Sequence, residues 1–253
     1  MTSTERHQLI LEKLHQEGDL NVISLYKELR VSRVTIRKDL KLLEEKGLLF
    51  RTHGGATLKN PYTIDRPVNE KEKLQSGEKS KIGAAAARLI DDNDSIIIAS
   101  GTTVLALAKK IQNKKNLTVI TASLNVALEL LQQPDIEVLQ LGGILRKTSS
   151  SVTGPYAQSI LADFSCTKLF LGVDGIDLEF GLSTTSAMEA HLNRQMIEAS
   201  QKVIVLSDST KFGKRGFGKI CGLDKVDRII TDAGISEHFV KQLENLGIEV
   251  TVV

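Results

Sequence analysis

Positively charged side chains gather on one short segment of this sequence. Placed on a helix at about 100° per residue, Arg37, Lys38 and Lys41 lie opposite the apolar residues of the same segment. Such a face attracts nucleic-acid phosphates, and the first half of a recognition helix reaches base edges in the major groove. The candidate DNA contacts on this helix are Ser32, Arg33, Val34, Thr35, Arg37, Lys38 and Lys41.

The segment has start and stop signals for a helix. Ser32 is a favoured N-cap residue because its hydroxyl accepts a hydrogen bond from a free backbone N–H, and Gly47 suits the left-handed position after the last turn. An amphipathic helix whose charges are only solvated is the plainer alternative. A protein-binding adaptor is another alternative, against which the basic face argues.

A small hairpin is expected after this helix. Residues 48–58 read as two short strands joined by a Gly54-Gly55 turn. This hairpin forms a wing that brings Arg51 and His53 to the DNA backbone.

The charge distribution supports the same conclusion. The chain of 253 residues has a formal net charge of +2, but residues 31–60 hold seven Lys and Arg against three Asp and Glu, a local charge of +4. The rest of the chain therefore sums to −2. Positive charge is concentrated where phosphates would be met.

A second group of candidates lies in loops that follow β-branched runs. In doubly wound sheets, ligands bind at the carboxyl ends of strands, where helix N-termini present free N–H groups. Residues 100–103 combine a glycine with three hydroxyl side chains and can cradle a phosphate. The same residue types are ordinary helix caps, so a capping role stays open. Polar residues at six strand ends together favour a small anionic polyol as ligand.

The other strand ends add charged groups to this site. Arg146 is a candidate phosphate clamp, and Lys211 offers a cation. Asp174 can accept two sugar hydroxyls, although a turn-forming Asp beside Gly is equally common. The candidate effector contacts are Ser100, Gly101, Thr102, Thr103, Ser123, Gly143, Arg146, Asp174, Glu189 and Lys211.

Strands and helices alternate along the second part of the chain, which predicts an α/β fold with a mainly parallel sheet covered on both faces. We expect a winged helix-turn-helix domain at residues 1–58 and an effector-binding domain at residues 79–253. Residues 59–78 are polar and hold two of the four prolines, as expected of a linker. The expected strands are residues 95–99, 117–121, 136–141, 168–173, 202–206, 228–231 and 249–252.

Composition excludes several classes of protein. Cys166 and Cys221 lie far apart and the five histidines are dispersed, which indicates a reducing compartment and no zinc site. No apolar run approaches the length that spans a bilayer. We expect a soluble, cytoplasmic protein that needs no metal or cofactor and binds no membrane.

The residues described so far resemble a known family. The segment from Ser32 to Ala56 resembles the winged helix-turn-helix of the DeoR family of bacterial sugar-metabolism regulators, and residues 79–231 are similar to the sensor domain of that family. The first resemblance is carried by Ser32, Thr35, Ile36, Arg37, Asp39, Leu40, Leu43, Glu44, Gly47, Leu48, His53, Gly54, Gly55 and Ala56. The second is carried by residues 100–103, 142–143, 172–175 and 208–211.

The resemblance implies a Rossmann-like sensor domain, similar in fold to ribose-5-phosphate isomerase, that binds a phosphorylated sugar. By this resemblance residues 100–103 hold the phosphate, with Asp174, Glu189 and Lys211 nearby. It also implies a repressor of a carbohydrate catabolic operon that binds double-stranded operator DNA. Because one chain offers one recognition helix, two half-sites require a homodimer or a homotetramer.

A sugar-phosphate isomerase is the main alternative. Such an enzyme needs a base, and cations that stabilise an enediolate. Asp174, Asp177 and Glu189 resemble its acidic residues. Its active-site loop, however, carries a lysine where this sequence has the uncharged residues 181–185. Binding without turnover is therefore expected, with the signal passing through the linker.

Overall fold

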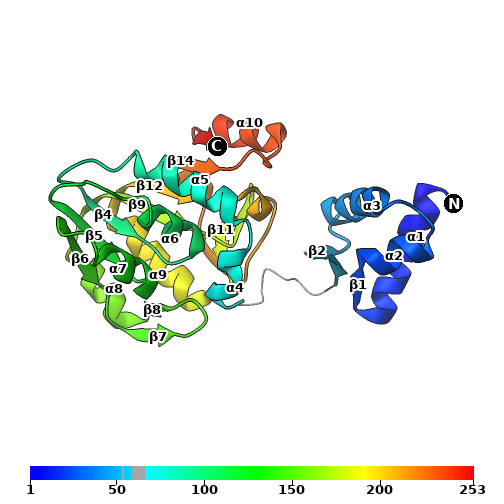
Figure 1. Ribbon diagram of the computed structural model, residues 1–253, viewed down its shortest axis with the longest axis horizontal. Helices are drawn as coiled ribbons and strands as arrows, with labels where there is room; N and C mark the ends of the chain where they lie inside the picture. Colours follow the sequence, from blue (N-terminus) through cyan, green and yellow to red (C-terminus); the bar gives the residue numbers. More distant parts are fainter. Residues whose placement is uncertain (53, 59–65) are drawn as a thin grey trace. The chain divides into compact units, whose positions relative to one another are not determined.

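The computed structural model describes residues 1–52, 54–58 and 66–253. They form two compact units, Met1–Ile64 and Asp65–Val253, coloured along the sequence in Figure 1. The second unit begins ahead of residue 79 because two helices form within residues 66–78. These are α4 (Val68–Lys73) and the first turn of α5 (Ser76–Ala87). Residues 59–65 of the expected linker lie outside the described part of the chain.

The first unit combines three helices with a three-stranded antiparallel sheet of order β1-β3-β2. The expected winged helix-turn-helix is confirmed, and its wing contains one strand that the sequence did not predict, β1. This strand has three residues, too few for a recognisable period-2 pattern. The elements are α1 (Ser3–Glu17), β1 (Asp19–Asn21), α2 (Val22–Glu28), α3 (Arg33–Glu45), β2 (Phe50–Thr52) and β3 (Gly55–Thr57).

Gly55, expected in the wing turn, belongs to a strand instead. It pairs with Thr52 and is the first residue of β3. A glycine is required in that strand, because a Cβ on Gly55 would lie 1.6 Å from the carbonyl oxygen of Leu20 in β1. The close approach of β1 to β3 therefore depends on Gly55. His53, expected at the DNA backbone, lies outside the described residues.

A buried ionic cluster joins α1 to α3. Asp39 accepts hydrogen bonds from Arg6 Nε at 2.5 Å and Arg6 Nη2 at 2.9 Å. His7 Nε2 lies 2.9 Å from the same carboxylate, so His7 is a half-buried partner of Asp39 and not a solvent-exposed residue. Burial raises the pKa of Asp39, but Arg6 and His7 outweigh it and hold that pKa below its ordinary value. The cluster fixes α3 on the unit.

The second unit is built on a seven-stranded sheet in which every neighbouring pair is parallel. This confirms the expected α/β class and all seven expected strands, each to within two residues at either end. The strand order is β15-β14-β12-β9-β4-β5-β6. The strands are β4 (Ser95–Ile98), β5 (Leu117–Thr121), β6 (Ile136–Gln140), β9 (Cys166–Gly172), β12 (Ser200–Leu206), β14 (Arg228–Thr231) and β15 (Glu249–Val252).

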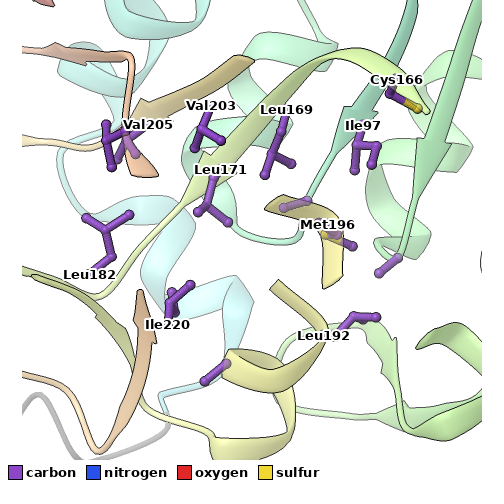
Figure 2. Close-up of a cluster of buried hydrophobic side chains, with 14 of the residues drawn as sticks. Ile97, Cys166, Leu169, Leu171, Leu182, Leu192, Met196, Val203, Val205 and Ile220 are labelled. Carbon is purple, nitrogen blue, oxygen red and sulfur yellow. The ribbon is translucent and has the colours of Figure 1, made fainter. Parts of the chain in front are cut away.

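Alternating side chains fill both faces of this sheet. In β9, Leu169 and Leu171 point into one apolar cluster while Phe170 points into the other. Figure 2 shows the first cluster, where Leu169 and Leu171 meet Met196 from the adjoining helix. Helices α5, α6 (Thr102–Ala108) and α7 (Leu124–Leu130) cover one face. Helices α8 (Pro155–Leu161), α9 (Ala187–Glu198) and α10 (Glu237–Asn245) pack on the other.

Several short elements complete the second unit. The uncharged residues 181–185, which correspond to an active-site loop in the isomerase alternative, form a strand, β11, as far as Thr184. It pairs on both sides in a small antiparallel sheet whose register a single sequence does not reveal. The short elements are β7 (Ile144–Arg146), β8 (Ser151–Thr153), β10 (Gly175–Asp177), β11 (Gly181–Thr184), β13 (Gly218–Cys221) and the 3-10 helices η1 (Ser209–Lys211) and η2 (Leu223–Lys225).

Within the described ranges, no helix has the length and apolarity needed to cross a membrane. The same residues contain no group of three or more His, Cys, Asp or Glu side chains arranged to hold a metal ion. Both cysteines, Cys166 and Cys221, are free.

Candidate DNA-binding surface and effector site

Helix α3 buries one face and presents the other. Ile36, Leu40 and Leu43 are at most 2% exposed and pack into the core of the first unit. Ser32 accepts a hydrogen bond from the backbone N–H of Thr35 at 3.0 Å, which starts the helix at the expected residue. Thr35 is half-buried, and the other candidate contacts of this helix are exposed: Ser32, Arg33, Val34, Arg37, Lys38 and Lys41.

Three arginines line a groove between α3 and the wing, namely Arg33, Arg37 and Arg51. The Arg33 guanidinium lies 4.7 Å from the centroid of the Tyr26 ring and donates to its hydroxyl at 3.3 Å, which fixes its direction. Arg51 donates its backbone N–H to Glu44 at 2.9 Å. The groove gathers positive charge along the edge where a wing meets a recognition helix, as phosphate contacts require.

The second unit has its candidate site where the chain reverses direction across the sheet. The chain enters at β4, proceeds outward to β5 and β6, and returns on the other side of β4 as β9. Ligands of open parallel sheets bind beyond the carboxyl ends of strands at such a point. A cavity of ≈ 110 Å³ lies there, lined among others by Ser100, Gly101, Thr102, Thr103, Asp174, Glu189 and Lys211.

The loop after β4 forms one wall of this cavity. Gly101 has φ 127°, a conformation that favours glycine, and a Cβ at that position would meet no atom within 4 Å. Thr102 and Thr103, 9% and 8% exposed, begin α6 directly afterwards. The first N–H groups of a helix have no partner inside it, so this loop offers donors of the kind that a phosphate accepts from.

Asp174 follows β9 and lies opposite that loop. Its Oδ2 accepts hydrogen bonds from Thr184 Oγ1 at 3.0 Å and from the Thr185 N–H at 3.2 Å. Its Oδ1 accepts from Lys71 Nζ at 3.0 Å. Burial raises the pKa of Asp174, but Lys71 and Lys211 outweigh burial and leave that pKa below its ordinary value. The side chain is an ionised acceptor on the cavity wall.

Arg146 supports the wall of the cavity and does not belong to its described lining. Its Nη1 lies 2.7 Å from Glu189 Oε2. Ser151 donates to the other oxygen of Glu189 at 3.3 Å, and Glu189 is 8% exposed. The expected phosphate clamp is thus an ion pair that holds the Glu189 carboxylate in place.

Ser123 and Gly143 also lie outside the described lining. Ser123 caps α7 by accepting from the Val126 N–H at 3.3 Å, the structural role left open for such loops. A Cβ on Gly143, with φ 148°, would lie 2.6 Å from the carbonyl oxygen of Thr153, so this glycine allows a close backbone crossing. Both residues follow β5 and β6, on the side of β4 away from β9, β12 and their loops.

Cations enter the cavity from helices that the sequence did not assign to it. The cavity is lined by Lys71 of α4, by Arg66 just before that helix, and by Lys79 of α5. Lys79 lies on the buried side of α5 with Ile82 and Ala86. A lysine among apolar residues of a helix is a sequence signal that could have identified it as a site residue. Residues 181–185 carry no cation, as expected, but other segments bring lysines and an arginine to the same cavity.

Lys79 is held in an unusual environment. It is 6% exposed, and its Nζ donates to the carbonyl oxygens of Lys71 and Leu74, both at 2.6 Å. Burial lowers its pKa to about 8, with Lys211 and Lys71 acting in the same direction and Asp208 opposing them. Lys79 ties the end of α4 to the cavity and carries a charge that depends on pH near neutrality.

Asn193 is a further lining residue that the sequence analysis missed. It stands one turn after Glu189 on α9, so both side chains face the cavity. The residue is 6% exposed and lines the cavity. An amide in this position can bond to a ligand hydroxyl.

Comparison with known families decides the assignment. The family model described as "DeoR C terminal sensor domain" matches residues 74–233, and the one described as "DeoR-like helix-turn-helix domain" matches residues 6–61. The chain belongs to the DeoR family. This confirms the class of protein expected from the sequence, a DNA-binding transcription regulator with a sensor domain.

Curated relatives of this DeoR-family chain match over nearly its whole length. An Escherichia coli O157:H7 protein named for the aga operon is 37% identical over 99% of this chain and 94% of its own. The HTH-type transcriptional repressor GlcR of Bacillus subtilis is 35% identical over 100% and 97%. The glycerol-3-phosphate regulon repressor of Escherichia coli K12 is 32% identical over 92% of each chain.

Among solved structures, ribose 5-phosphate isomerase from Plasmodium falciparum superimposes with a TM-score of 0.41 and 18% sequence identity. The match covers 55% of this chain and 54% of the isomerase.

Proposed function

We propose that this DeoR-family regulator represses a carbohydrate catabolic operon and that a phosphorylated sugar, bound at the cavity of the second unit, releases it from operator DNA. The observation that carries the proposal is the cavity itself. It combines a glycine-containing hydroxyl loop, several lysines and carboxylate and amide acceptors at one switch point of the sheet. The names of two relatives, a transcriptional repressor and a glycerol-3-phosphate regulon repressor, support the same class of regulation.

On the DNA side, the proposed contacts are the exposed residues of α3 and the wing. Arg37 and Lys38 are assigned to base edges and adjacent phosphates, because they project from the N-terminal half of α3. Arg33 and Arg51 are assigned to phosphates along the groove. The remaining contacts we propose are Ser32, Val34, Thr35, Lys41 and His53.

On the effector side, the phosphate is assigned to the loop of residues 100–103 and to Lys211. A phosphate monoester carries a charge of about −1.5 to −2 near pH 7, so it requires both cations and N–H donors. The sugar hydroxyls are assigned to Asp174, Glu189 and Asn193, which supply two carboxylates and an amide on the cavity wall.

We propose that the site binds its ligand without turning it over. Lysines line the cavity, so a lack of cations does not argue against an isomerase. The argument against an isomerase is that the site lacks a suitable general base. A general base works best with a pKa near the operating pH, whereas Asp174 is held ionised with a lowered pKa and accepts three hydrogen bonds. Formation of ketose from ribose 5-phosphate at enzymatic rates would overturn this.

A homodimer or a homotetramer acting in the cytoplasm completes the proposal. One chain supplies one recognition helix, and operators of helix-turn-helix regulators are read as pairs of half-sites. Sedimentation of the purified chain measures the assembly. A monomer that binds operator DNA tightly would contradict this part.

The testing experiment combines two readings. A thermal-shift screen uses inorganic phosphate, glycerol 3-phosphate, ribose 5-phosphate and hexose 6-phosphates. Compounds that raise the melting temperature are then added to complexes with duplex DNA that the protein selects from its own genome. The proposal expects at least one phosphate ester to stabilise the protein and release the DNA. Absence of a stabilising ester, or esters that bind without affecting the DNA, would contradict it.

A further inference from the structure

An ion pair connects the cavity to the helix that precedes it in the chain. Lys71 Nζ lies 3.0 Å from Asp174 Oδ1, and the two side chains are 26% and 16% exposed. Lys71 belongs to α4, the first described element after the DNA-binding unit, and residues 59–65 join the two. A contact made by Lys71 therefore lies both in the effector cavity and on the covalent path to the first unit.

Helix α4 depends on contacts with the rest of the second unit to keep its position. It is six residues long, Pro67 at its N-cap supplies no side-chain hydrogen bond, and Val68 is its one buried residue. A helix this short does not persist without tertiary contacts. Those of α4 include the Val68 N–H to the Thr148 carbonyl at 2.6 Å, Lys79 donating to the carbonyls of Lys71 and Leu74, and an ion pair at 2.8 Å between the exposed side chains of Glu72 and Lys109. The Lys71–Asp174 pair is the contact of this set that also lies in the cavity.

The cavity is small for the ligand assigned to it. Its ≈ 110 Å³ is below the range of roughly 300–1,000 Å³ that small-molecule sites occupy. Arg66 and Lys71 line the cavity on the α4 side. A sugar phosphate therefore requires side chains of this segment to move.

The ligand chemistry identifies which contact gives way. A phosphate of charge about −1.5 to −2 attracts an ammonium more strongly than a single carboxylate does. A neighbouring hydroxyl on the same molecule can donate to the Asp174 oxygen that Lys71 leaves. A phosphorylated polyol thus offers a replacement partner to each member of the pair at once.

We infer that the Lys71–Asp174 ion pair is the element that the effector breaks: the phosphate takes Lys71, a hydroxyl takes Asp174, and α4 leaves its docked position. This inference rests on the proposed function and adds the route by which effector binding reaches the DNA-binding unit. The DNA-binding unit receives the signal because α4 is the element to which it is connected. The ligand class is narrowed to molecules that carry a phosphate and a hydroxyl together.

Hydrogen exchange of the full-length chain tests the inference directly. Amide exchange is followed for the peptide covering residues 66–75, with α9 as reference, without ligand and with a saturating probe. The probe is whichever of glycerol 3-phosphate, ribose 5-phosphate and glucose 6-phosphate raises the melting temperature most. Exchange in residues 66–75 is expected to rise at least about tenfold with the probe while α9 is unchanged or slowed.

Two variants remove the pair from either side, and a third is a matched control. Lys71→Met and Asp174→Asn should show fast exchange in residues 66–75 without ligand and little further change with it. Lys73→Met, an exposed lysine on the same helix, should behave as the unsubstituted chain. Using both Lys71→Met and Asp174→Asn keeps the test valid if one of them folds poorly.

The outcomes separate this inference from the function on which it rests. If no probe stabilises the chain, the proposed function and the inference fail together. If a probe binds and releases DNA while exchange in residues 66–75 is unchanged or slowed, the inference alone is wrong. Slow exchange in both ion-pair variants without ligand would also overturn it.

Discussion

The carboxylate of Asp39 accepts two hydrogen bonds from the guanidinium of Arg6, at 2.5 and 2.9 Å, in the core of the DNA-binding unit. The two side chains are 5% and 10% exposed. Asp39 stands on the recognition helix between the residues that face DNA, and Arg6 stands on α1. The pair therefore sets the rotation of α3 about its own axis.

Replacing Asp39 by Asn should destabilise the first unit by about 3–5 kcal/mol, because it leaves the buried Arg6 charge without its partner. Thermal unfolding should show an earlier transition for this unit, and DNA binding should weaken with it. Glu12→Gln changes an exposed carboxylate of α1 and serves as the control. An unchanged transition in Asp39→Asn would show that the pair does not support the helix.

Replacing Arg37 or Lys38 by Ala should cripple DNA binding and leave effector binding intact. Each lost phosphate contact should also lower the slope of log K against log salt by about 1. Fluorescence anisotropy at several salt concentrations measures both effects. Lys202→Ala, an exposed lysine of the second unit, should change neither. Equal loss in the control would assign the effect to overall charge instead of to the recognition helix.

Replacing Lys211 by Met should give the opposite result, with weakened binding of phosphate esters and normal operator affinity. Lys211 lines the cavity beside Asp174 and supplies charge to the proposed phosphate position. Isothermal calorimetry with the stabilising ester measures the loss. Lys241→Met on the exposed face of α10 is the matched control. Normal ester affinity in Lys211→Met would remove this residue from the site.

Replacing Asn193 by Leu should discriminate between ligands. Asn193 lines the cavity, where its amide can bond to a sugar hydroxyl. Affinity for the sugar phosphate should fall about tenfold, while affinity for inorganic phosphate should stay the same. A parallel loss for both ligands would mean that the variant disturbs the cavity as a whole.

Stability should rise between about pH 8 and pH 10.5 through Lys79. Its pKa is about 8 in the folded chain against an ordinary value of 10.5, so the unfolded chain binds more protons between these values. Unfolding free energy then increases with pH by an amount on the order of 1–3 kcal/mol. Urea titrations across this range measure the slope. The extra slope should vanish in Lys79→Met, and an identical slope in that variant would contradict the assignment.

The regular parts of the fold were accessible from the sequence because they follow local rules. The strands Leu117–Thr121, Arg228–Thr231 and Glu249–Val252 match the expected bounds, since each is a β-branched run between turn residues. The recognition helix was predicted in the same way, from the Ser32 cap and the apolar stripe that contains Ile36 and Leu40. The short strands β1 and β7 were missed because each has only three residues, and β11 was missed because one of its partners, β13, lies far along the chain.

The candidate site was only partly accessible for a related reason. The loops after β4 and β9 border one cavity because their strands are neighbours in the sheet. The order of strands in a sheet cannot be predicted from the local sequence of each strand. Ser123 and Gly143 follow strands on the far side of β4, so they serve local structure instead. Lys71 was missed because it sits in a segment that reads as a linker, and its role becomes visible only through its contact with Asp174.

The account depends most on the coupling between the two units, which one titration measures. Operator affinity is determined by anisotropy with and without a saturating phosphate ester, and ester affinity is determined for the free and the DNA-bound protein. The account predicts that the ester weakens operator binding about 5- to 150-fold and that DNA weakens ester binding by the same factor. Equal ester affinity for the free and DNA-bound forms would contradict it.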